Sequence, residues 1–401
     1  TMVERRAMET EAIHAGEMHD ASGAHIAPIH QTSTFTYENL KAVTDWASGD
    51  TDAYIYSRVG NPTRQALAGK LAALEGFDSD EPDRIVGEIF GSGMAAIAAA
   101  LMGIAKAGDH VIAQQVLYGS ADHLISEVLP QYGITTSRVP GLTPDALDAE
   151  LAKHPNTKVV YLETPANPTL RVIDIEATAQ LAAAHGARVV ADNTFATPIL
   201  QRPLAHGAAV VVHSTTKYIN GHGTVIGGAA ITNDPLLMEE AITPQVRFVG
   251  GVPSPFDCWL TNTGLKTLPL RMERHCQNAA AVADFLDGHP AVTATHYPGL
   301  AQHPEHRLAG RQMNGFGAMI AFDVGSFEVA GDFLDRIKLC TLAVSLGNVD
   351  TLIEHPASMT HRVVPPEVRA ASGITDGLIR MSVGLEAAAD IIADLDQALR
   401  V

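Results

Sequence analysis

The fold is decided by the stretch Val210-Val-Val-His-Ser-Thr-Thr-Lys217, in which an apolar run ends in hydroxyl side chains and a lysine. An unbroken run of β-branched residues is typical of a strand buried on both faces, as in parallel sheets. Two earlier runs, Val159–Leu162 and Val189–Ala191, have the same character and also end in polar residues. The carboxyl ends of parallel strands meet at one edge of the sheet, so we expect these polar side chains to lie together.

Helical patterns separate these strand candidates. The Ala/Leu-rich stretch Ile175–His185 lies between two of them, and Ala95–Lys106 precedes a further strand candidate at His110–Ile112. Strands that alternate with helices predict an α/β fold with a mostly parallel central sheet.

Shifts in composition divide the chain into three parts. We expect residues 1–61 to form an irregular N-terminal arm, residues 62–253 a large α/β domain and residues 254–401 a smaller C-terminal α/β domain. Helices are predicted at Thr63–Glu75, Leu260–Phe285, Val329–Ile337 and Asp390–Leu399, and strands of the last part at Gly317–Phe322 and Leu378–Ser382.

The composition excludes several classes of protein. Of the 401 residues, 46% are hydrophobic and 18% charged, within the range of an ordinary globular protein. The net charge of −18 disfavours general binding to nucleic acid, whose phosphates would repel the chain. Residues 1–10 carry charges and no apolar run, so no secretory signal is predicted there, and we expect a cytoplasmic protein without membrane partners.

Lys217 and Asp192 are the first candidates for chemistry. A lysine that follows a buried strand is partly desolvated, which lowers its pKa and exposes a nucleophilic amine. Asp192 ends the neighbouring strand candidate, where a carboxylate could pair with the ring nitrogen of pyridoxal phosphate (PLP). The alternatives are a lysine at a strand end without a catalytic role and an aspartate that caps a helix.

A phosphate site is indicated by Gly91-Ser-Gly93-Met94, which precedes the predicted helix Ala95–Lys106. Small residues at a helix start expose backbone N–H groups to an anion, and Ser214 and Thr216 could add hydroxyl donors. The pattern alone is weak, and it lacks the GxGxxG spacing of dinucleotide sites. Tyr118 is suited to stack on a cofactor ring, with a core tyrosine as the alternative.

Arg380 interrupts the apolar strand candidate Leu378–Ser382. A buried arginine almost always pairs with a carboxylate. The partner would be either a carboxylate of the protein, in a structural salt bridge, or the α-carboxylate of an amino-acid substrate.

Motifs spread over nearly the whole chain resemble the Cys/Met-metabolism PLP-dependent enzymes, the family of methionine γ-lyase, cystathionine γ-lyase, cystathionine γ-synthase and O-acetylhomoserine sulfhydrylase. These motifs include Tyr56-Ser-Arg58-Val-Gly-Asn-Pro-Thr63, Ser92-Gly-Met94, Leu117-Tyr-Gly119, Glu163-Thr-Pro-Ala-Asn-Pro168, Ala191-Asp-Asn-Thr194, Ser214-Thr-Thr-Lys217, His355-Pro-Ala-Ser-Met-Thr-His361 and Arg380-Met-Ser-Val-Gly-Leu-Glu386.

The resemblance implies an aspartate-aminotransferase-like architecture (fold type I of PLP-dependent transferases) and a homotetramer built from two dimers. It further implies a Schiff base between PLP and Lys217, with Tyr118 as the acid that protonates the leaving sulfur. The other implied roles are Asp192 at the ring nitrogen, Gly93, Met94, Ser214 and Thr216 at the phosphate, Asn167 at the ring oxygen, Ser345 and Arg380 at the substrate carboxylate, and Tyr56 and Arg58 at the phosphate of the neighbouring subunit.

Val344 bears on the choice of substrate. Cystathionine-processing members usually carry Glu at this position, where it can pair with the distal ammonium of cystathionine, whereas an apolar residue suits the S-methyl group of methionine. We therefore expect γ-elimination of L-methionine to methanethiol, ammonia and 2-oxobutanoate. Departures from the methionine γ-lyase pattern are Ser120 in place of Cys, Thr224 in place of Asp, and Val246-Arg247 in place of Lys-Asp.

Other functions remain as alternatives. Cystathionine cleavage, or γ-replacement on an O-acylated homoserine, would use the same cofactor. A PLP-binding protein without catalysis is disfavoured, because Lys217, Asp192, Tyr118 and Arg380 are all present. A metal site at His303-Pro-Glu-His306 is also disfavoured, since Pro304 interrupts the helix that would align the two histidines, and a solvated turn is expected instead.

Overall fold

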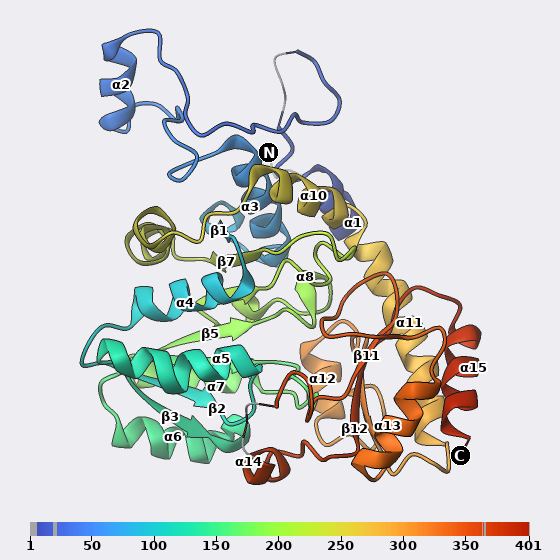
Figure 1. Ribbon diagram of the computed structural model, residues 1–401. Coiled ribbons are helices and arrows are strands. Elements are labelled where there is room, and N and C mark those ends of the chain that lie inside the picture. The colour runs from blue at the N-terminus through green and yellow to red at the C-terminus, as the bar shows by residue number, and fades with distance from the viewer. Residues whose placement is uncertain (1–5, 19–21, 363, 365, 401) are drawn as a thin grey trace.

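A computed structural model describes residues 6–18, 22–362, 364 and 366–400. Parts of the predicted arm (residues 1–5 and 19–21) and residues 363, 365 and 401 of the predicted C-terminal part lie outside the described residues. The described chain builds two β-sheets, one of seven strands and one of five (Figure 1).

The seven-stranded sheet confirms the predicted mostly parallel core. Its strand order is β1-β7-β6-β5-β4-β2-β3. Neighbours from β6 to β3 run parallel, and only β7 pairs antiparallel with the strands on both of its sides. The strands are β1 (Val86–Phe90), β2 (His110–Gln114), β3 (Thr135–Val139), β4 (Thr157–Glu163), β5 (Arg188–Asp192), β6 (Val210–His213) and β7 (Gly228–Thr232).

Helices cover both faces of this sheet. Along β4, Val159 and Tyr161 pack into one apolar cluster, whereas Val160 and Leu162 pack into another on the opposite face. The continuous apolar run is thereby explained, because each face of the strand needs its own apolar side chains. The helices of this region are α3 (Pro62–Glu75), α4 (Gly93–Ile104), α5 (Gly119–His123), α6 (Pro144–Lys153), α7 (Ile175–Ala184), α8 (Thr197–Leu200) and α9 (Pro235–Leu237).

The five-stranded sheet belongs to the C-terminal part of the chain and has the order β10-β11-β12-β9-β8. In Figure 1 its strands lie beside α11, α13 and α15. The strands are β8 (Ala294–His296), β9 (Met319–Asp323), β10 (Thr341–Leu342), β11 (Leu352–Glu354) and β12 (Leu378–Ser382), and the helices are α12 (His306–Gln312), α13 (Phe327–Arg336), α14 (Pro366–Ala371) and α15 (Ala388–Leu399).

The single helix predicted over Leu260–Phe285 is wrong. The structure has two helices here, α10 (Pro255–Leu265) and α11 (Leu268–Asp287). Pro269 occupies the first turn of α11, where its missing N–H costs nothing, whereas a continuous helix would have placed it in the interior and broken the hydrogen-bond ladder.

The N-terminal segment is less irregular than expected. It contains α1 (Met8–His14) and α2 (Leu40–Ala47). Helix α1 packs on its own chain, since the buried ammonium of Lys70 donates to the carbonyls of Ala12 (3.1 Å) and Ile13 (2.8 Å). Helix α2 has no buried residue and projects from the body of the molecule in Figure 1.

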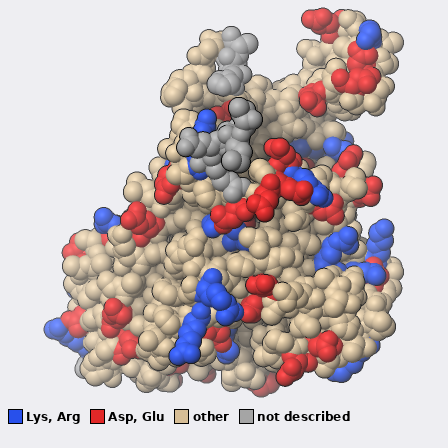
Figure 2. Space-filling model, turned by 180° about the vertical axis from the view of Figure 1, so that it is seen from behind, with Lys and Arg blue, Asp and Glu red and all other residues tan. Residues whose placement is uncertain are grey.

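The surface carries charged side chains of both signs. Figure 2 shows a face on which acidic and basic side chains are interspersed among uncharged residues. Among the described residues, no helix is both long enough and apolar enough to cross a membrane. Cys258 and Cys340 are buried and Cys276 is partly buried, and all three are free thiols.

Candidate active site

A cavity of about 470 Å³ lies at the carboxyl edge of β4, β5 and β6. Every predicted site residue except Tyr56 and Arg58 lines it. The lining consists of Ser92, Gly93, Met94, Ile97, Tyr118, Glu163, Pro165, Asn167, Asp192, Thr194, Phe195, Ser214, Thr216, Lys217, Ile226, Val344, Ser345, Leu346, Thr360 and Arg380.

Lys217 projects into the cavity from the turn after β6. Its Nζ donates a hydrogen bond to Oγ of Ser345 over 2.7 Å. Burial lowers the pKa of Lys217 to about 8, and the nearby guanidinium of Arg380 acts in the same direction. Ser345 has a φ of +89°, a conformation that is strained for a residue with a side chain and typical of functional sites.

Two carboxyl groups end adjacent strands at the floor of the cavity. Glu163 of β4 and Asp192 of β5 are directly paired in the sheet register. Burial and the charge of Asp192 raise the pKa of Glu163 to about 8. Burial also raises the pKa of Asp192, although the backbone N–H of Thr194, 2.9 Å from Oδ1, favours the ionised form. A cation placed between the two would relieve this cost.

Glu163 is a cavity residue for which the sequence predicted no role. Its two carboxylate oxygens accept the backbone N–H of Tyr118 at 3.1 and 2.9 Å. The carboxylate therefore fixes the start of α5, from which the Tyr118 side chain enters the cavity. Its position at the carboxyl end of a buried strand is the sequence signal that could have identified it as a site residue.

The start of α4 offers a place for a phosphate. The Oγ of Ser92 caps the helix by accepting the N–H of Ala95 at 3.1 Å. A Cβ added to Gly93 would come within 2.8 Å of the Cβ of Ser214, so only glycine lets the helix approach this hydroxyl so closely. Helix N–H groups and hydroxyls that converge in this way fit an anion.

Arg380 is buried in β12, where it lines the cavity and also binds other residues of the protein. Nη1 lies 3.0 Å from Oε1 of Glu354 and also donates to Oδ1 of Asn167 at 3.0 Å. Nη2 donates to the carbonyl of Ser345 at 2.7 Å. The structural salt bridge that the sequence left open is therefore present, and its partner Glu354 was missed because its position in the sequence gives no sign of the pairing.

Tyr56 and Arg58 lie away from the cavity. The guanidinium of Arg58 stacks 5.6 Å from the ring centre of Tyr56 and donates to the carbonyl of Arg247. The Tyr56 side chain is exposed. Neither residue contributes to the cavity of its own chain.

The residues that distinguish family members differ in burial and in whether they line the cavity. Val344 lines the cavity and is half exposed. Ser120 and Thr224 are exposed, Val246 is buried and Arg247 is half-buried. At His303 the predicted turn is present, but its predicted solvation is wrong, since this side chain is 3% exposed. Its Nδ1 accepts the backbone N–H of Glu305 at 3.3 Å and lies 3.7 Å from Oε2 of the same residue, so these contacts stay within the turn.

Comparisons with known proteins agree with this geometry. The model of the family described as Cys/Met metabolism PLP-dependent enzyme matches residues 9–400. The L-methionine gamma-lyase of Fusobacterium nucleatum subsp. polymorphum is 47% identical over 97% of each chain, and the cystathionine gamma-lyase of Bacillus subtilis is 45% identical over 98% of each.

A solved structure shares both fold and cofactor chemistry. The putative O-acetylhomoserine (thiol)-lyase of Campylobacter jejuni, determined with N'-pyridoxyl-lysine-5'-monophosphate, superposes with a TM-score of 0.93 at 34% identity, covering 99% of this chain and 100% of that one. A fold-type-I architecture, a lysine in a cavity at the strand ends and a family match over nearly the whole length lead to one conclusion: the chain belongs to the Cys/Met-metabolism PLP-dependent enzymes.

Proposed function

We propose that this enzyme is a methionine γ-lyase, which converts L-methionine and water to methanethiol, ammonia and 2-oxobutanoate. The observation that carries the choice of substrate is the apolar side chain of Val344 in the cavity, next in sequence to Ser345, the hydrogen-bond partner of Lys217. An uncharged S-methyl group fits an apolar wall, and the distal ammonium of cystathionine would find no carboxylate on Val344.

The cavity fits PLP. Gly93, Met94, Ser214 and Thr216 would hold its phosphate, and Asp192 would face its ring nitrogen. Bound PLP supplies an electron sink that stabilises negative charge at the substrate Cα. The other contacts we propose are Tyr118 against the ring face, Asn167 at the ring oxygen and Lys217 as the point of covalent attachment.

The protein's own groups would move the protons. With a pKa of about 8, Lys217 is partly neutral near pH 7, so its amine can take the Cα proton of the substrate. The Tyr118 hydroxyl would give a proton to the departing sulfur. Arg380, held by Glu354, would bind the substrate carboxylate and fix its orientation.

We further propose that the active site is shared between subunits of a homotetramer. Tyr56 and Arg58 lie outside their own cavity and both are exposed, which suits groups that reach the phosphate site of a neighbour. In this arrangement residues 1–61 act as an arm, residues 62–253 form the PLP-binding domain and residues 254–401 the small domain.

We also propose a cytoplasmic location, which the three free thiols support because the cytoplasm is reducing.

Cystathionine cleavage is the second candidate. The identity to a cystathionine gamma-lyase is nearly as high as that to a methionine gamma-lyase, and Ser120 and Thr224 depart from the methionine γ-lyase pattern. γ-Replacement on an O-acylated homoserine would require the same residues and a second nucleophile.

The test measures 2-oxobutanoate release by PLP-loaded protein from L-methionine and from L-cystathionine in parallel, with Lys217→Ala as the inactive control. Faster release from methionine supports the proposal. A clear preference for cystathionine contradicts it and favours the second candidate. Release from neither, together with thiol-dependent consumption of O-acetylhomoserine, would assign γ-replacement.

A further inference from the structure

A short loop segment, Ser345-Leu-Gly347, lies between Lys217 and β12, and we refer to it as the Ser345 loop. At its start, Oγ of Ser345 accepts the hydrogen bond from Nζ of Lys217 at 2.7 Å. At its end, Gly347 approaches the neighbouring backbone directly, since a Cβ added to this glycine would lie 2.5 Å from the backbone N of Tyr218. A displacement of the loop would therefore move the Ser345 hydroxyl relative to the lysine.

Two side chains of β12 bind the Ser345 loop at its two ends. Nη2 of Arg380 donates to the carbonyl of Ser345 at 2.7 Å, and Oγ of Ser382 accepts the N–H of Gly347 at 2.8 Å. Arg380 and Ser382 are two residues apart, so the strand directs both side chains to the same face. The strand itself is fixed on both sides, because β12 pairs antiparallel with β11 and with β9.

The backbone of Ser345 depends on these contacts. A φ of +89° is strained for a residue with a side chain, and such strain persists only where the surrounding structure enforces it. Ser382 and Gly347 are both buried, so loss of the Ser382 hydroxyl would leave the Gly347 N–H without an acceptor and away from water. We expect the loop to relax when this hydroxyl is removed.

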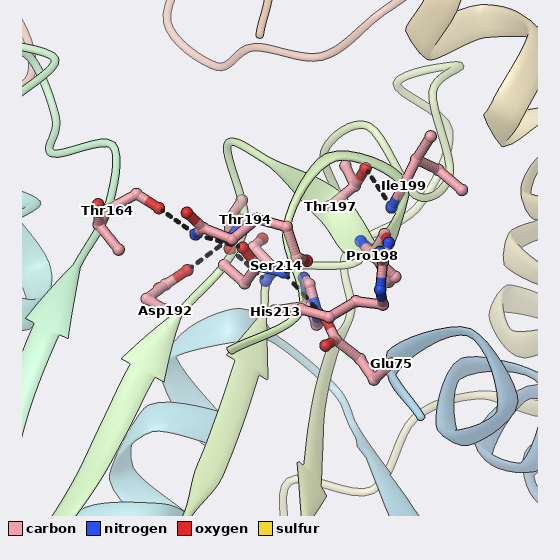
Figure 3. A network of polar contacts seen from close by, with 12 residues as sticks. Glu75, Thr164, Asp192, Thr194, Thr197, Pro198, Ile199, His213 and Ser214 are labelled. Atoms are coloured by element: carbon pink, nitrogen blue, oxygen red, sulfur yellow. Dashed lines mark hydrogen bonds and ion pairs between the residues drawn. The ribbon is translucent and has the colours of Figure 1, made fainter. Parts of the chain in front are cut away.

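The strand end that carries Lys217 is fixed by other contacts (Figure 3). The N–H of Ser214 donates to Oγ1 of Thr194 at 2.9 Å, and Nε2 of His213 lies 2.6 Å from Oε1 of Glu75. These contacts involve no residue of the Ser345 loop. A change in β12 should therefore leave the backbone of Lys217 in place and alter the surroundings of its amine.

The Lys217 amine has charged neighbours on several elements. Arg380 of β12 opposes its protonation, whereas Glu354 of β11 favours it. Further titratable side chains that line the cavity are Tyr118 next to α5, Glu163 of β4 and Asp192 of β5. The Ser345 hydroxyl is an uncharged acceptor, and its hydrogen bond favours the protonated amine, because an ammonium is the stronger donor.

We propose that Ser382 is a positioning residue, which holds the Ser345 loop so that the Ser345 hydroxyl stays within hydrogen-bond distance of the Lys217 amine. This inference rests on the proposed function, in which the same amine takes the Cα proton of the substrate. Proton transfer requires the amine to lie close to that proton. The hydroxyl supplies a point of attachment for the amine that belongs to the protein and depends on neither cofactor nor substrate.

The test measures the reaction of Lys217 with a trace of acetic anhydride in the apoprotein as a function of pH. Wild type is compared with Ser382→Ala, Ser345→Ala and the double variant. Loss of the hydrogen bond to the protonated amine should lower the pH midpoint of labelling, by about half a pH unit in Ser382→Ala and about one unit in Ser345→Ala. The double variant should match Ser345→Ala, because Ser382 acts through a hydroxyl that is already absent.

Two controls separate this role from a general loss of structure. Thr232→Val is the matched variant: Oγ1 of Thr232 is also buried and accepts a backbone N–H at a strand end, that of Asp234 at 3.1 Å. Because β7 runs antiparallel to β6, Thr232 lies at the end of the sheet away from the cavity. This variant should lower the urea unfolding midpoint without moving the pH midpoint.

The second control is Ser382→Cys, in which a thiol of similar size is a weaker acceptor. It should shift the pH midpoint of Lys217 in the same direction as Ser382→Ala but by less. It also takes the place of the alanine variant if that protein does not fold.

The outcomes are distinguishable. An unchanged or raised midpoint in Ser382→Ala, an equal further shift when Ser345→Ala is already present, or a shift of the same size in Thr232→Val would each overturn the role of Ser382. The proposed function would be left intact. Its own failure would show as absence of 2-oxobutanoate release from the PLP-loaded wild type, whereas labelling of the apoprotein requires no turnover.

Discussion

Arg380 and Glu354 form a buried ion pair at the wall of the cavity, with Nη1 of the arginine 3.0 Å from Oε1 of the glutamate. The two residues lie opposite each other in the register of β12 and β11. Glu354 offsets the charge of Arg380 and fixes the orientation of its guanidinium group. The affinity of Arg380 for a substrate carboxylate should therefore depend on Glu354, which does not line the cavity.

The first prediction concerns this pair. Glu354→Gln or Arg380→Met alone should each destabilise the apoprotein by about 3 kcal/mol, because each leaves an uncompensated buried charge. The double variant should lose less than the sum of the two. Urea unfolding midpoints of the four proteins provide the measurement. Strict additivity of the midpoint shifts would mean that the pair contributes no coupling.

The second prediction concerns the pH dependence of Lys217. Its amine is mostly protonated below pH 8 and mostly neutral above, so its reaction with a trace of acetic anhydride in the apoprotein should rise with pH and have its midpoint near pH 8. Peptide mass spectrometry gives the extent of labelling, with the exposed Lys158 as internal reference. Arg380→Met should move the inflection to higher pH, since it removes a nearby cation. An inflection near pH 10 in the wild type would refute the lowered pKa.

Much of the cavity was predictable because its residues follow strands that are readable from local sequence. The apolar runs of β4, β5 and β6 locate the strand ends, and parallel pairing brings Asp192, Ser214 and Lys217 to one edge. Family motifs supplied the predicted roles of residues outside these strands.

The partners of these residues were not predictable. Glu354 meets Arg380 only through antiparallel pairing of β11 with β12, and Glu75 meets His213 across 138 residues of chain. Strand β1 was also missed, because Val86-Gly-Glu-Ile-Phe90 contains a glycine and a glutamate in place of a continuous apolar run. Glu88 is accommodated there because Nε of Arg64, on α3, lies 3.5 Å from its Oε1. Such pairings depend on tertiary structure and leave no local pattern.

The third prediction concerns substrate choice. Val344→Glu should raise the ratio of L-cystathionine to L-methionine turnover about fivefold, the effect of one partly exposed ion pair with the distal ammonium. Val344→Gln has the same shape without the charge and serves as the control. The ratio of kcat/KM values for the two substrates is measured for all three proteins. An equal change in the Glu and Gln variants would assign the effect to size and not to charge.

The fourth prediction concerns the shared site. If Arg58 completes the cavity of the neighbouring subunit, then Lys217→Ala and Arg58→Ala should each have little activity alone. Co-expressed in equal amounts, they should recover about a quarter of the wild-type activity, because random pairing gives that fraction of sites an intact Lys217 and an intact neighbouring Arg58.

The matched control co-expresses Lys217→Ala with Arg380→Ala. Both of these residues line the cavity of their own chain, so no pairing of subunits restores a complete site and activity should stay at the level of the single variants. Recovery in the first mixture and none in the second would place Arg58 in the neighbour's site. If neither mixture recovers activity, Arg58 acts within its own chain, through its contact with the Arg247 carbonyl, and the arm has no part in the neighbouring cavity.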